Sequence, residues 1–415
     1  MGHYIIDGTR LSDQDKLFEQ ALIAAHTGKQ RPMCACKQPP IEMYLARINS
    51  DQVIVKRMPG SGHSHATGCD HYQPPAELSG RGELQSKAII EDEATGQTTL
   101  KLDFSLSKTS ITRTMNREGG KSASVIKADP KKLSLLSMIH YLYDEAGLNR
   151  WSPRMQGKRN WAVVRYHLLN AASKTTAKKM NLADVLLIPE PFRIEDKAGI
   201  ATRRRQFISK FKKKGASQPV GIAIGELKAL DKARFGFKMT LKHQPDTPLY
   251  LADDVHKRIE KNFSSEVALW QQDKTAHVLI AATFTISASG NLTVEAITLM
   301  ATDANWLPFD DYDERAMIEK LTTERRRFIK GLRYNLSPGD VIATCLLTDT
   351  GDIPTALYID PYNDEENPDY TATLDRVIED SEYDSVVWRP LLGDVLNLPP
   401  VSQPSAWNGI DNNDQ

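Results

Sequence analysis

The sequence lacks any apolar run of the roughly 18 residues that a membrane-spanning helix requires. Its first residues, Met1 to Asp7, also lack the positive start and the long apolar core of a signal peptide. No net charge remains, because 53 Lys and Arg balance 53 Asp and Glu. Four cysteines in 415 residues are too few for a disulfide scaffold. We therefore expect a cytoplasmic protein with no membrane partner.

Most of the cysteine is concentrated in one stretch, residues 34–71, which also holds three of the ten histidines. The residues concerned are Cys34, Cys36, His63, His65, Cys69 and His71. Thiolate sulfur and imidazole nitrogen are the usual ligands of structural zinc, which takes four of them in a tetrahedron. The stretch is otherwise short of large apolar side chains, so a metal would supply stability that its core cannot. The sequence predicts a structural Zn²⁺ site.

The preferred ligands are Cys34, Cys36, His65 and Cys69. Cys-x-Cys offers two thiolates from one turn, and residues four apart lie on one side of a helical turn. His71 is an alternative fourth ligand, because Cys-x-His after Cys-x-Cys resembles the SWIM-type zinc finger. The gap between the pairs is longer here than that family shows, and His63 is a third option. A closed set of four leaves no open position, so the zinc is expected to be structural.

The pattern of periodic segments predicts an α+β, multidomain protein. An N-terminal zinc-binding module is expected to contain a hairpin formed by residues 42–48 and 53–57, with Asn49-Ser50-Asp51 at its turn. A basic helical middle and an α/β C-terminal domain follow. The expected regions are the zinc module (1–75), a strand pair with a polar connection (76–132), the helical region (133–215), a β-rich region (216–300), the α/β domain (301–398) and a flexible tail (399–415).

Charge is unevenly distributed along the chain although its total is zero. Residues 303–384 hold twenty acidic and eight basic residues, whereas 150–180 and 203–214 hold fifteen basic residues and no acidic ones. Such single-sign segments favour phosphate binding, and we expect a nucleic acid, DNA first. The residues proposed to contact it are Arg154, Lys158, Arg159, Arg165, Arg203, Arg204, Arg205, Lys212, Lys213 and Lys214.

The helices around Gly147 suggest a helix-turn-helix. The rival partner of the basic segments is an acidic protein surface, including the chain's own C-terminal third.

Three carboxylates of the C-terminal third suggest an enzyme. Glu314 lies on a helix expected at 313–333, and Asp349 and Asp360 each follow a short apolar strand. A helix acid and two strand-end acids can hold Mg²⁺ against a phosphate. This order resembles the PD-(D/E)xK nuclease fold. That family has a lysine two residues after the second strand acid, where this chain has Tyr362, so Lys330 would have to substitute.

A second set is Glu226-Leu227-Lys228 after the strand expected at 220–224, with Asp184 or Glu190 as its partner acid. The tripeptide is common, and the alternative interpretation of either set is that its members are solvated acids in turns. A metal-dependent nuclease is thus the alternative to a non-catalytic nucleic-acid-binding protein, and an adaptor with structural zinc is the third possibility.

Several segments together resemble an uncharacterised bacterial family, domain of unknown function 1173. They are Cys34-Ala35-Cys36, Arg57-Met58-Pro59-Gly60, His65 with Cys69, Ile188-Pro189-Glu190-Pro191-Phe192 and Leu346-Leu347-Thr348-Asp349-Thr350. Members of that family carry three cysteines near the N-terminus and are often encoded near integrative or conjugative elements. The resemblance covers nearly the whole chain and implies a bacterial protein of a mobile element, without implying any activity.

Overall fold

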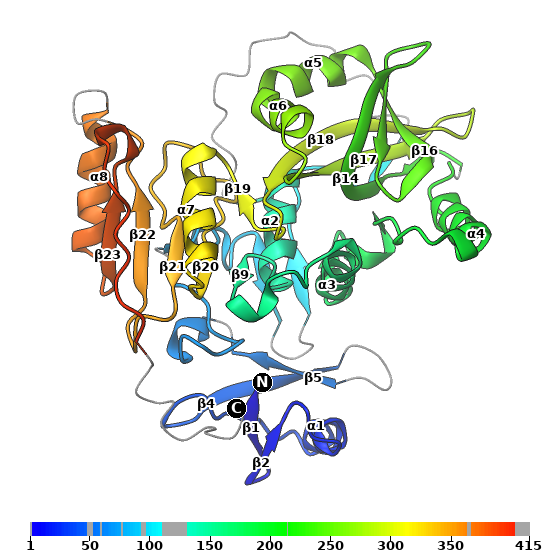
Figure 1. The fold of residues 1–415 in the computed structure, drawn as a ribbon. Coiled ribbons are helices and arrows are strands. Elements are labelled where there is room, and N and C mark those ends of the chain that lie inside the picture. Colours follow the sequence, from blue (N-terminus) through cyan, green and yellow to red (C-terminus); the bar gives the residue numbers. More distant parts are fainter. Residues whose placement is uncertain are drawn as a thin grey trace. The chain divides into compact units, whose positions relative to one another are not determined.

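The computed structural model describes residues 2–47, 53–58, 60–75, 78–92, 97–109, 131–213, 215–362 and 367–402 (Figure 1). The protein is α+β, as predicted. It divides into two compact units, each made of separate segments. The first unit comprises residues 1–99, 149–154 and 316–415, and the second comprises residues 100–148 and 155–315. In the described part of the chain, no helix has the length and apolarity needed to cross a membrane.

The helices of the described residues are α1 (Phe18–Thr27), α2 (Leu135–Glu145), α3 (Trp161–Ser173), α4 (Lys197–Ser209), α5 (Asp253–Asn262), α6 (Ser264–Gln272), α7 (Tyr312–Thr323) and α8 (Pro368–Glu379). Helix α1 starts after Leu17, and Ser12 belongs to the strand before it. Helices α5 and α6 are separated at Phe263.

The N-terminal part of the first unit is an antiparallel sheet in the order β2-β1-β3-β4-β5. Its strands are β1 (His3–Ile6), β2 (Thr9–Ser12), β3 (Met33–Cys34), β4 (Ile41–Arg47) and β5 (Val53–Arg57). The β4–β5 pairing confirms the predicted hairpin, whose turn falls outside the described residues. A small core of Tyr4, Ile6, Leu22, Met43 and neighbours fixes α1 on this sheet. The strands β6 (Ile89–Glu91) and β7 (Thr98–Leu100) follow.

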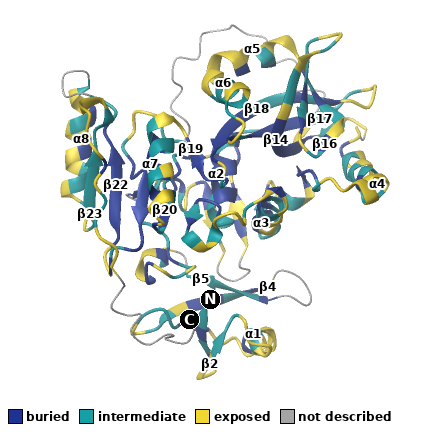
Figure 2. Ribbon diagram, in the orientation of Figure 1, coloured by how far each residue is buried: buried dark blue, intermediate teal, exposed yellow. Residues whose placement is uncertain are grey.

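The C-terminal part of the first unit is a second sheet, in the order β23-β22-β21-β20-β9. Its strands are β9 (Arg150–Trp151), β20 (Phe328–Lys330), β21 (Cys345–Leu347), β22 (Thr355–Ile359) and β23 (Asp384–Trp388). Strands β20, β21 and β22 form an antiparallel meander, and β23 joins parallel to β22 after α8. Figure 2 shows β20 and β22 buried and much of α8 exposed, so α8 covers one face of the sheet.

The helix expected at 313–333 ends early, and this corrects the prediction. It stops at Thr323, and residues 328–330 form the central strand β20. All three β20 side chains are buried, and β9 and β21 pair with this strand on either side. Helical periodicity and a short, fully buried strand cannot be distinguished over so few residues.

The second unit is built around five strands, β14 (Gly221–Lys232), β15 (Phe237–Leu241), β16 (Gln244–Leu251), β17 (His277–Ile286) and β18 (Leu292–Thr302). Two short strands extend this sheet, namely β12 (Leu186–Leu187), which is parallel to β14, and β19 (Pro308–Phe309), which pairs with β18. The second unit also contains the pairing of β8 (Ser107–Thr109) with β13 (Ser217–Pro219) and that of β10 (Thr175–Ala177) with β11 (Met180–Asn181). Helices α2, α5 and α6 pack against β18 or β17.

The structure does not contain the suggested helix-turn-helix. Helices α2 and α3 are separated by fifteen residues that include β9, instead of the short turn that the motif requires. Helix α2 is mostly buried, with Met138, Ile139 and Leu142 in the core, so it offers no surface to a DNA groove. Trp161 is also buried, and its indole N–H donates to the carbonyl of Pro189 at 2.8 Å.

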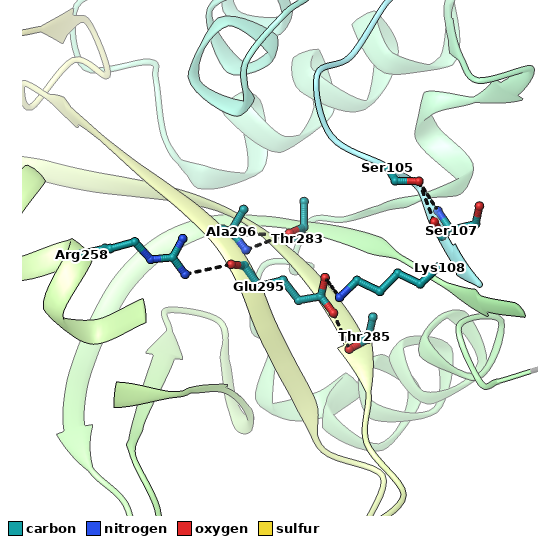
Figure 3. A network of polar contacts seen from close by, with 8 residues as sticks. All are labelled: Ser105, Ser107, Lys108, Arg258, Thr283, Thr285, Glu295 and Ala296. Atoms are coloured by element: carbon teal, nitrogen blue, oxygen red, sulfur yellow. Dashed lines mark hydrogen bonds and ion pairs between the residues drawn. The ribbon is translucent and has the colours of Figure 1, made fainter. Parts of the chain in front are cut away.

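A polar network fastens β8 and α5 to β18 (Figure 3). The Glu295 carboxylate of β18 pairs with the ammonium group of Lys108 and accepts a hydrogen bond from the Thr285 hydroxyl. The backbone carbonyl of Glu295 accepts a 3.3 Å hydrogen bond from Arg258 of α5. At the next residue of the strand, the amide of Ala296 donates to the Thr283 hydroxyl at 3.0 Å. These contacts hold β8 and α5 against β18.

Candidate metal centre

The four predicted ligands come from two loops of the first unit. Cys34 ends β3 and Cys36 lies in the turn that follows it. His65 directly follows a short 3-10 helix, Gly62–Ser64, and a turn closed by the Cys69 N–H and the Ala66 carbonyl returns the chain to Cys69. The β4–β5 hairpin between the two loops makes residues so far apart in sequence neighbours in space, as its pattern predicts.

The spacing of the cluster is close to that of a tetrahedral metal site. One ligand atom from each of the four residues lies within 4.8 Å of all the others. The sulfurs of Cys34 and Cys69 are 3.7 Å apart, and Nδ1 of His65 lies 3.4 Å from the Cys36 sulfur and 3.8 Å from that of Cys69. Zinc with bonds of about 2.3 Å to sulfur and about 2.0 Å to nitrogen holds its ligand atoms roughly 3.5–3.8 Å apart. A disulfide needs about 2.05 Å, so these sulfurs are not bonded to each other.

Without a metal, the cluster favours negative charge on one sulfur, that of Cys36, while its neighbours and burial raise the pKa values of the Cys34 and Cys69 thiols. The backbone N–H groups of Ala66 and His71 point at the sulfurs of Cys36 and Cys69, each at 3.4 Å. Hydrogen bonds from Cys34, then from Cys69 and His65, lower the pKa of the Cys36 thiol far below its ordinary value. A thiolate surrounded by thiols and an imidazole is the arrangement that a divalent cation completes, because the metal displaces the remaining thiol protons.

His71 and His63 lie outside this set of four. The Tyr4 hydroxyl is 2.7 Å from Nε2 of His71, so this nitrogen is engaged away from the sulfurs. Burial, with the nearby His65 and Arg57, lowers the pKa of His71 to about 3, so its imidazole is neutral. His63 is exposed. The group of ligands that the structure brings together therefore contains His65, and the SWIM-like alternative with His71 is not formed.

The cluster lies between two hydrophobic cores of the first unit. Cys36 and Cys69 pack against the core of the N-terminal sheet, and Cys69 also packs against the core beneath α8. Tyr72, three residues later, is fully buried in that second core, and its carbonyl accepts a hydrogen bond from Arg150 of β9. A metal bound here would tie the N-terminal sheet to the C-terminal sheet.

The structure does not bring Asp349 and Asp360 together. They follow β21 and β22, and these strands are antiparallel with Leu347 opposite Thr355. Asp360 is five residues beyond Thr355, or roughly 17 Å along the strand. Each carboxylate is held by a different arginine, Asp349 by Arg326 at 2.8 Å and Asp360 by Arg389 at 3.3 Å. Two strand-end acids meet only when their strands run in the same direction.

Glu314 and Lys330 also make hydrogen bonds within the fold. The Glu314 carboxylate accepts a hydrogen bond from the Asp310 N–H, and its own N–H donates to the Asp311 carboxylate, both at 2.8 Å, so Glu314 helps to cap the start of its helix. Lys330 is buried in β20, and its ammonium group donates to the carbonyl of Gly331 at 2.7 Å. The catalytic assignment of Glu314, Asp349 and Asp360 stays a prediction. Asp349 and Asp360 do not share a site in this structure.

Glu226 is the acid whose surroundings the sequence predicted least well. It lies buried within β14, and its partners are His277, whose Nδ1 is 2.8 Å away, and Lys242 of the β15–β16 turn. Lys228 is exposed, as is Asp184, and Glu190 pairs with Arg203. Burial opposes ionisation of Glu226, but the hydrogen bonds from His277 and Lys242 outweigh it and lower its pKa. The His277 ring in turn stacks on Trp306, with centroids 4.0 Å apart.

The predicted nucleic-acid residues fall into three groups. Internal contacts occupy Arg159, Arg165, Arg203 and Arg204: the first two donate to backbone carbonyls, and the last two pair with Glu190 and Asp246. The exposed members are Arg154, Lys158, Arg205, Lys212 and Lys213. Lys214 lies outside the described residues. The basic run is therefore partly a framework of ion pairs, and only part of it faces solvent.

Fold and site together define an α+β protein with a Cys3His cluster that could hold a metal ion. The chain belongs to the family described as protein of unknown function (DUF1173), whose model matches residues 4–391. This confirms the resemblance seen in the sequence. No curated protein and no solved structure matches the chain.

Proposed function

We propose that the protein is a zinc-containing, non-catalytic nucleic-acid-binding protein. The observation that carries the zinc is the spacing of the four ligand atoms, within 4.8 Å of one another, on residues that are buried or half-buried between two cores. A set of three sulfurs and one nitrogen binds zinc in preference to magnesium or calcium. The ion would be structural, since four protein ligands complete the tetrahedron.

Metal analysis of purified protein tests the zinc. We expect one zinc per chain, retained through gel filtration, and its loss in Cys36→Ser and Cys69→Ser. The matched control is Cys345→Ala, because Cys345 is the one cysteine outside the cluster and lies buried in β21. Wild-type protein that folds and carries no metal, or Cys69→Ser protein that keeps its zinc, would contradict the proposal.

The nucleic-acid part of the proposal is supported by exposed cations of the second unit. Lys158, Arg205, Lys212 and Lys213 are exposed, and none of them forms an ion pair with the described acids. Neutralising phosphates with such residues releases counterions, so affinity should fall steeply as salt rises. The adaptor hypothesis predicts instead that these residues bind acidic protein surfaces.

Filter binding at low salt, with single- and double-stranded DNA and RNA, tests this part. We expect Lys212→Glu combined with Lys213→Glu to weaken binding at least tenfold. The matched control is Lys257→Glu with Lys261→Glu on α5, where both side chains are also exposed. Failure of the wild-type protein to retain any nucleic acid would end the proposal, as would binding that does not change with salt.

A further inference from the structure

The five main strands of the second unit close into a barrel. β14 pairs with β15, β15 with β16, β16 with β18, β18 with β17, and β17 with β14 again. β14 closes the ring because its first half, from Gly221 to Glu226, pairs with β17 and its second half, from Leu227, pairs with β15. A register shift after Leu227 marks the bend between the halves.

The order of this ring is specific. Numbered along the chain, the strands run 1-2-3-5-4-1, with strands 3 and 5 parallel, every other pairing antiparallel, and helices α5 and α6 inserted between strands 3 and 4. This is the topology of the OB fold, whose strand 2–3 face and flanking loops bind oligonucleotides or oligosaccharides. Because a fold alone does not establish a function, the face itself must be examined.

The outer face of β15 and β16 is the part of the barrel that the rest of the second unit leaves uncovered. β17 is buried over seven consecutive residues, so both of its faces are covered, and α2 and α6 pack against it. β15 and β16 instead alternate between buried residues, such as Met239 and Leu249, and accessible ones, such as Lys238 and Tyr250. Lys238 and Tyr250 lie opposite each other in the register.

This open face is basic and carries aromatic side chains. Phe235, at the tip of the β14–β15 hairpin, is 82% exposed, with the guanidinium of Arg234 5.3 Å from its ring centroid. The cations along the hairpin are Lys228, Lys232, Arg234 and Lys238, of which Lys238 lies in register with Tyr250, whereas Lys242 of the next turn is paired with Glu226. Its acids are few: Asp231 lies 3.9 Å from Lys238, and Asp246 is paired with Arg204. Exposed aromatic rings beside cations suit stacked bases and a phosphate backbone.

Helix α4 extends the same basic surface. The Arg204–Asp246 ion pair joins α4 to β16, and Phe211, which follows α4, packs edge-on against Phe284 of β17 at 5.2 Å between centroids. The exposed Arg205, Lys212 and Lys213 are therefore held beside the barrel. This attachment gives a physical reason for the internal ion pairs of the basic run: they position the cations that remain exposed.

We propose that the uncovered β14–β15–β16 face of this barrel binds single-stranded nucleic acid, with Phe235 and Tyr250 stacking on bases and the hairpin lysines and α4 contacting phosphates. The inference rests on the nucleic-acid binding proposed above and assigns its site and its strandedness. Stacking platforms of this kind tolerate many sequences, because every base has a π face.

Fluorescence anisotropy of the full chain with a labelled 20-nucleotide oligothymidine tests the site. We expect Phe235→Ala to weaken binding roughly tenfold, as loss of one stacked base does, and Phe235→Trp to restore it. Lys232→Ala with Lys238→Ala should lower the slope of log affinity against log salt by about 0.7 for each phosphate that is no longer neutralised. The control is Tyr312→Ala, which removes another exposed aromatic ring of the same unit.

The outcomes separate this inference from the function it rests on. If the wild type binds no nucleic acid, both fail. If it binds, but Phe235→Ala and the double lysine variant bind as the wild type does, the barrel site is overturned and the proposed function stands. A duplex bound more tightly than the single strand, or an oligosaccharide bound in its place, also overturns the inference. Unchanged thermal unfolding of Phe235→Ala excludes misfolding as the cause of weaker binding.

Discussion

The carboxylate of Asp349 is buried against the guanidinium of Arg326, with contacts of 2.8 Å and 3.1 Å. It also accepts the Arg327 N–H at 2.7 Å, and Arg326 continues to the carbonyl of Pro399. The side chains of the pair are only 8% and 4% exposed. The pair therefore fastens the end of β21 to the segment before β20 and to the chain at Pro399.

Removing one partner of such a pair leaves a buried, uncompensated charge. We expect Asp349→Ala to lower the free energy of unfolding by roughly 3–5 kcal/mol, measured by urea titration, while zinc content stays the same. Asp384→Ala serves as the control, since Asp384 is an exposed carboxylate on the same sheet. A nuclease activity present in the wild type and lost in a fully stable Asp349→Ala protein would contradict this structural role.

Glu226 gives a pH dependence of known sign. Its pKa is lower in the folded protein than its ordinary value of 4.5, because His277 and Lys242 hold its charge against the effect of burial. The stabilisation is therefore complete above pH 4.5 and is lost as the pH falls through the folded pKa. The difference in unfolding free energy between wild type and Glu226→Gln should shrink steadily below pH 4.5. If this difference in unfolding free energy stays constant from pH 6 to pH 3, the ion pair makes no contribution to stability.

At the scale of elements, the hairpin tips of the barrel depend on glycine to different degrees. Gly236 has φ +70°, and a Cβ there would lie 2.2 Å from the carbonyl oxygen of Leu251. Gly290, in the β17–β18 turn, has φ +84° with nothing within 4 Å of that position. Both tolerate positive φ because they have no Cβ, but only Gly236 is also sterically enclosed.

Alanine substitution distinguishes these two costs. Gly290→Ala should lower stability by about 1–2 kcal/mol, the strain of a left-handed residue. Gly236→Ala should cost roughly 2–4 kcal/mol, because backbone overlap is added to the same strain. Thermal unfolding of the two variants under identical conditions makes the comparison. Equal destabilisation by the two substitutions would mean that the β15–β16 backbone moves to make room for the new Cβ at no cost in free energy.

The barrel was not predicted from the sequence, because β16 and the second half of β14 were not recognised as strands. β16 contains Pro245, Asp246 and Pro248, which are residues that strands usually exclude. The structure accommodates them where the β15–β16 register shifts, so the prolines sit outside the regular ladder. The second half of β14 was missed for a similar reason, because Glu226, Lys228 and Asp231 break its apolar run. Without β16 and the second half of β14, the predicted strands cannot close into a barrel.

The candidate sites differ in predictability for a physical reason. The four zinc ligands lie in two short loops joined by a hairpin, so local pattern and ligand chemistry were enough to select them. The carboxylate set depended on strand direction, which neither periodicity nor spacing records. The Glu226–His277 contact joins residues 51 positions apart through barrel closure, and no local signal in the sequence pointed to it.

At the scale of the molecule, removing the metal should loosen one unit and spare the other. The Cys3His cluster contacts both cores of the first unit, whereas the barrel has its own core. We expect a strong chelator to abolish hydrogen-exchange protection in β3, β4 and β5 and around Tyr72. Protection in β14, β17 and β18 should persist. Uniform loss of protection along the whole chain would show that the two units unfold as one.

The first unit contains early and late segments of the chain, so its parts are synthesised at different times. Residues 1–99 leave the ribosome long before β20 to β23, whose core Cys69 also contacts. At elongation rates of up to about 20 residues per second, some 15 s or more separate Cys69 from Trp388. During that interval the nascent N-terminal sheet has no C-terminal partner, and an ion captured cotranslationally would hold its two loops in register until the rest arrives.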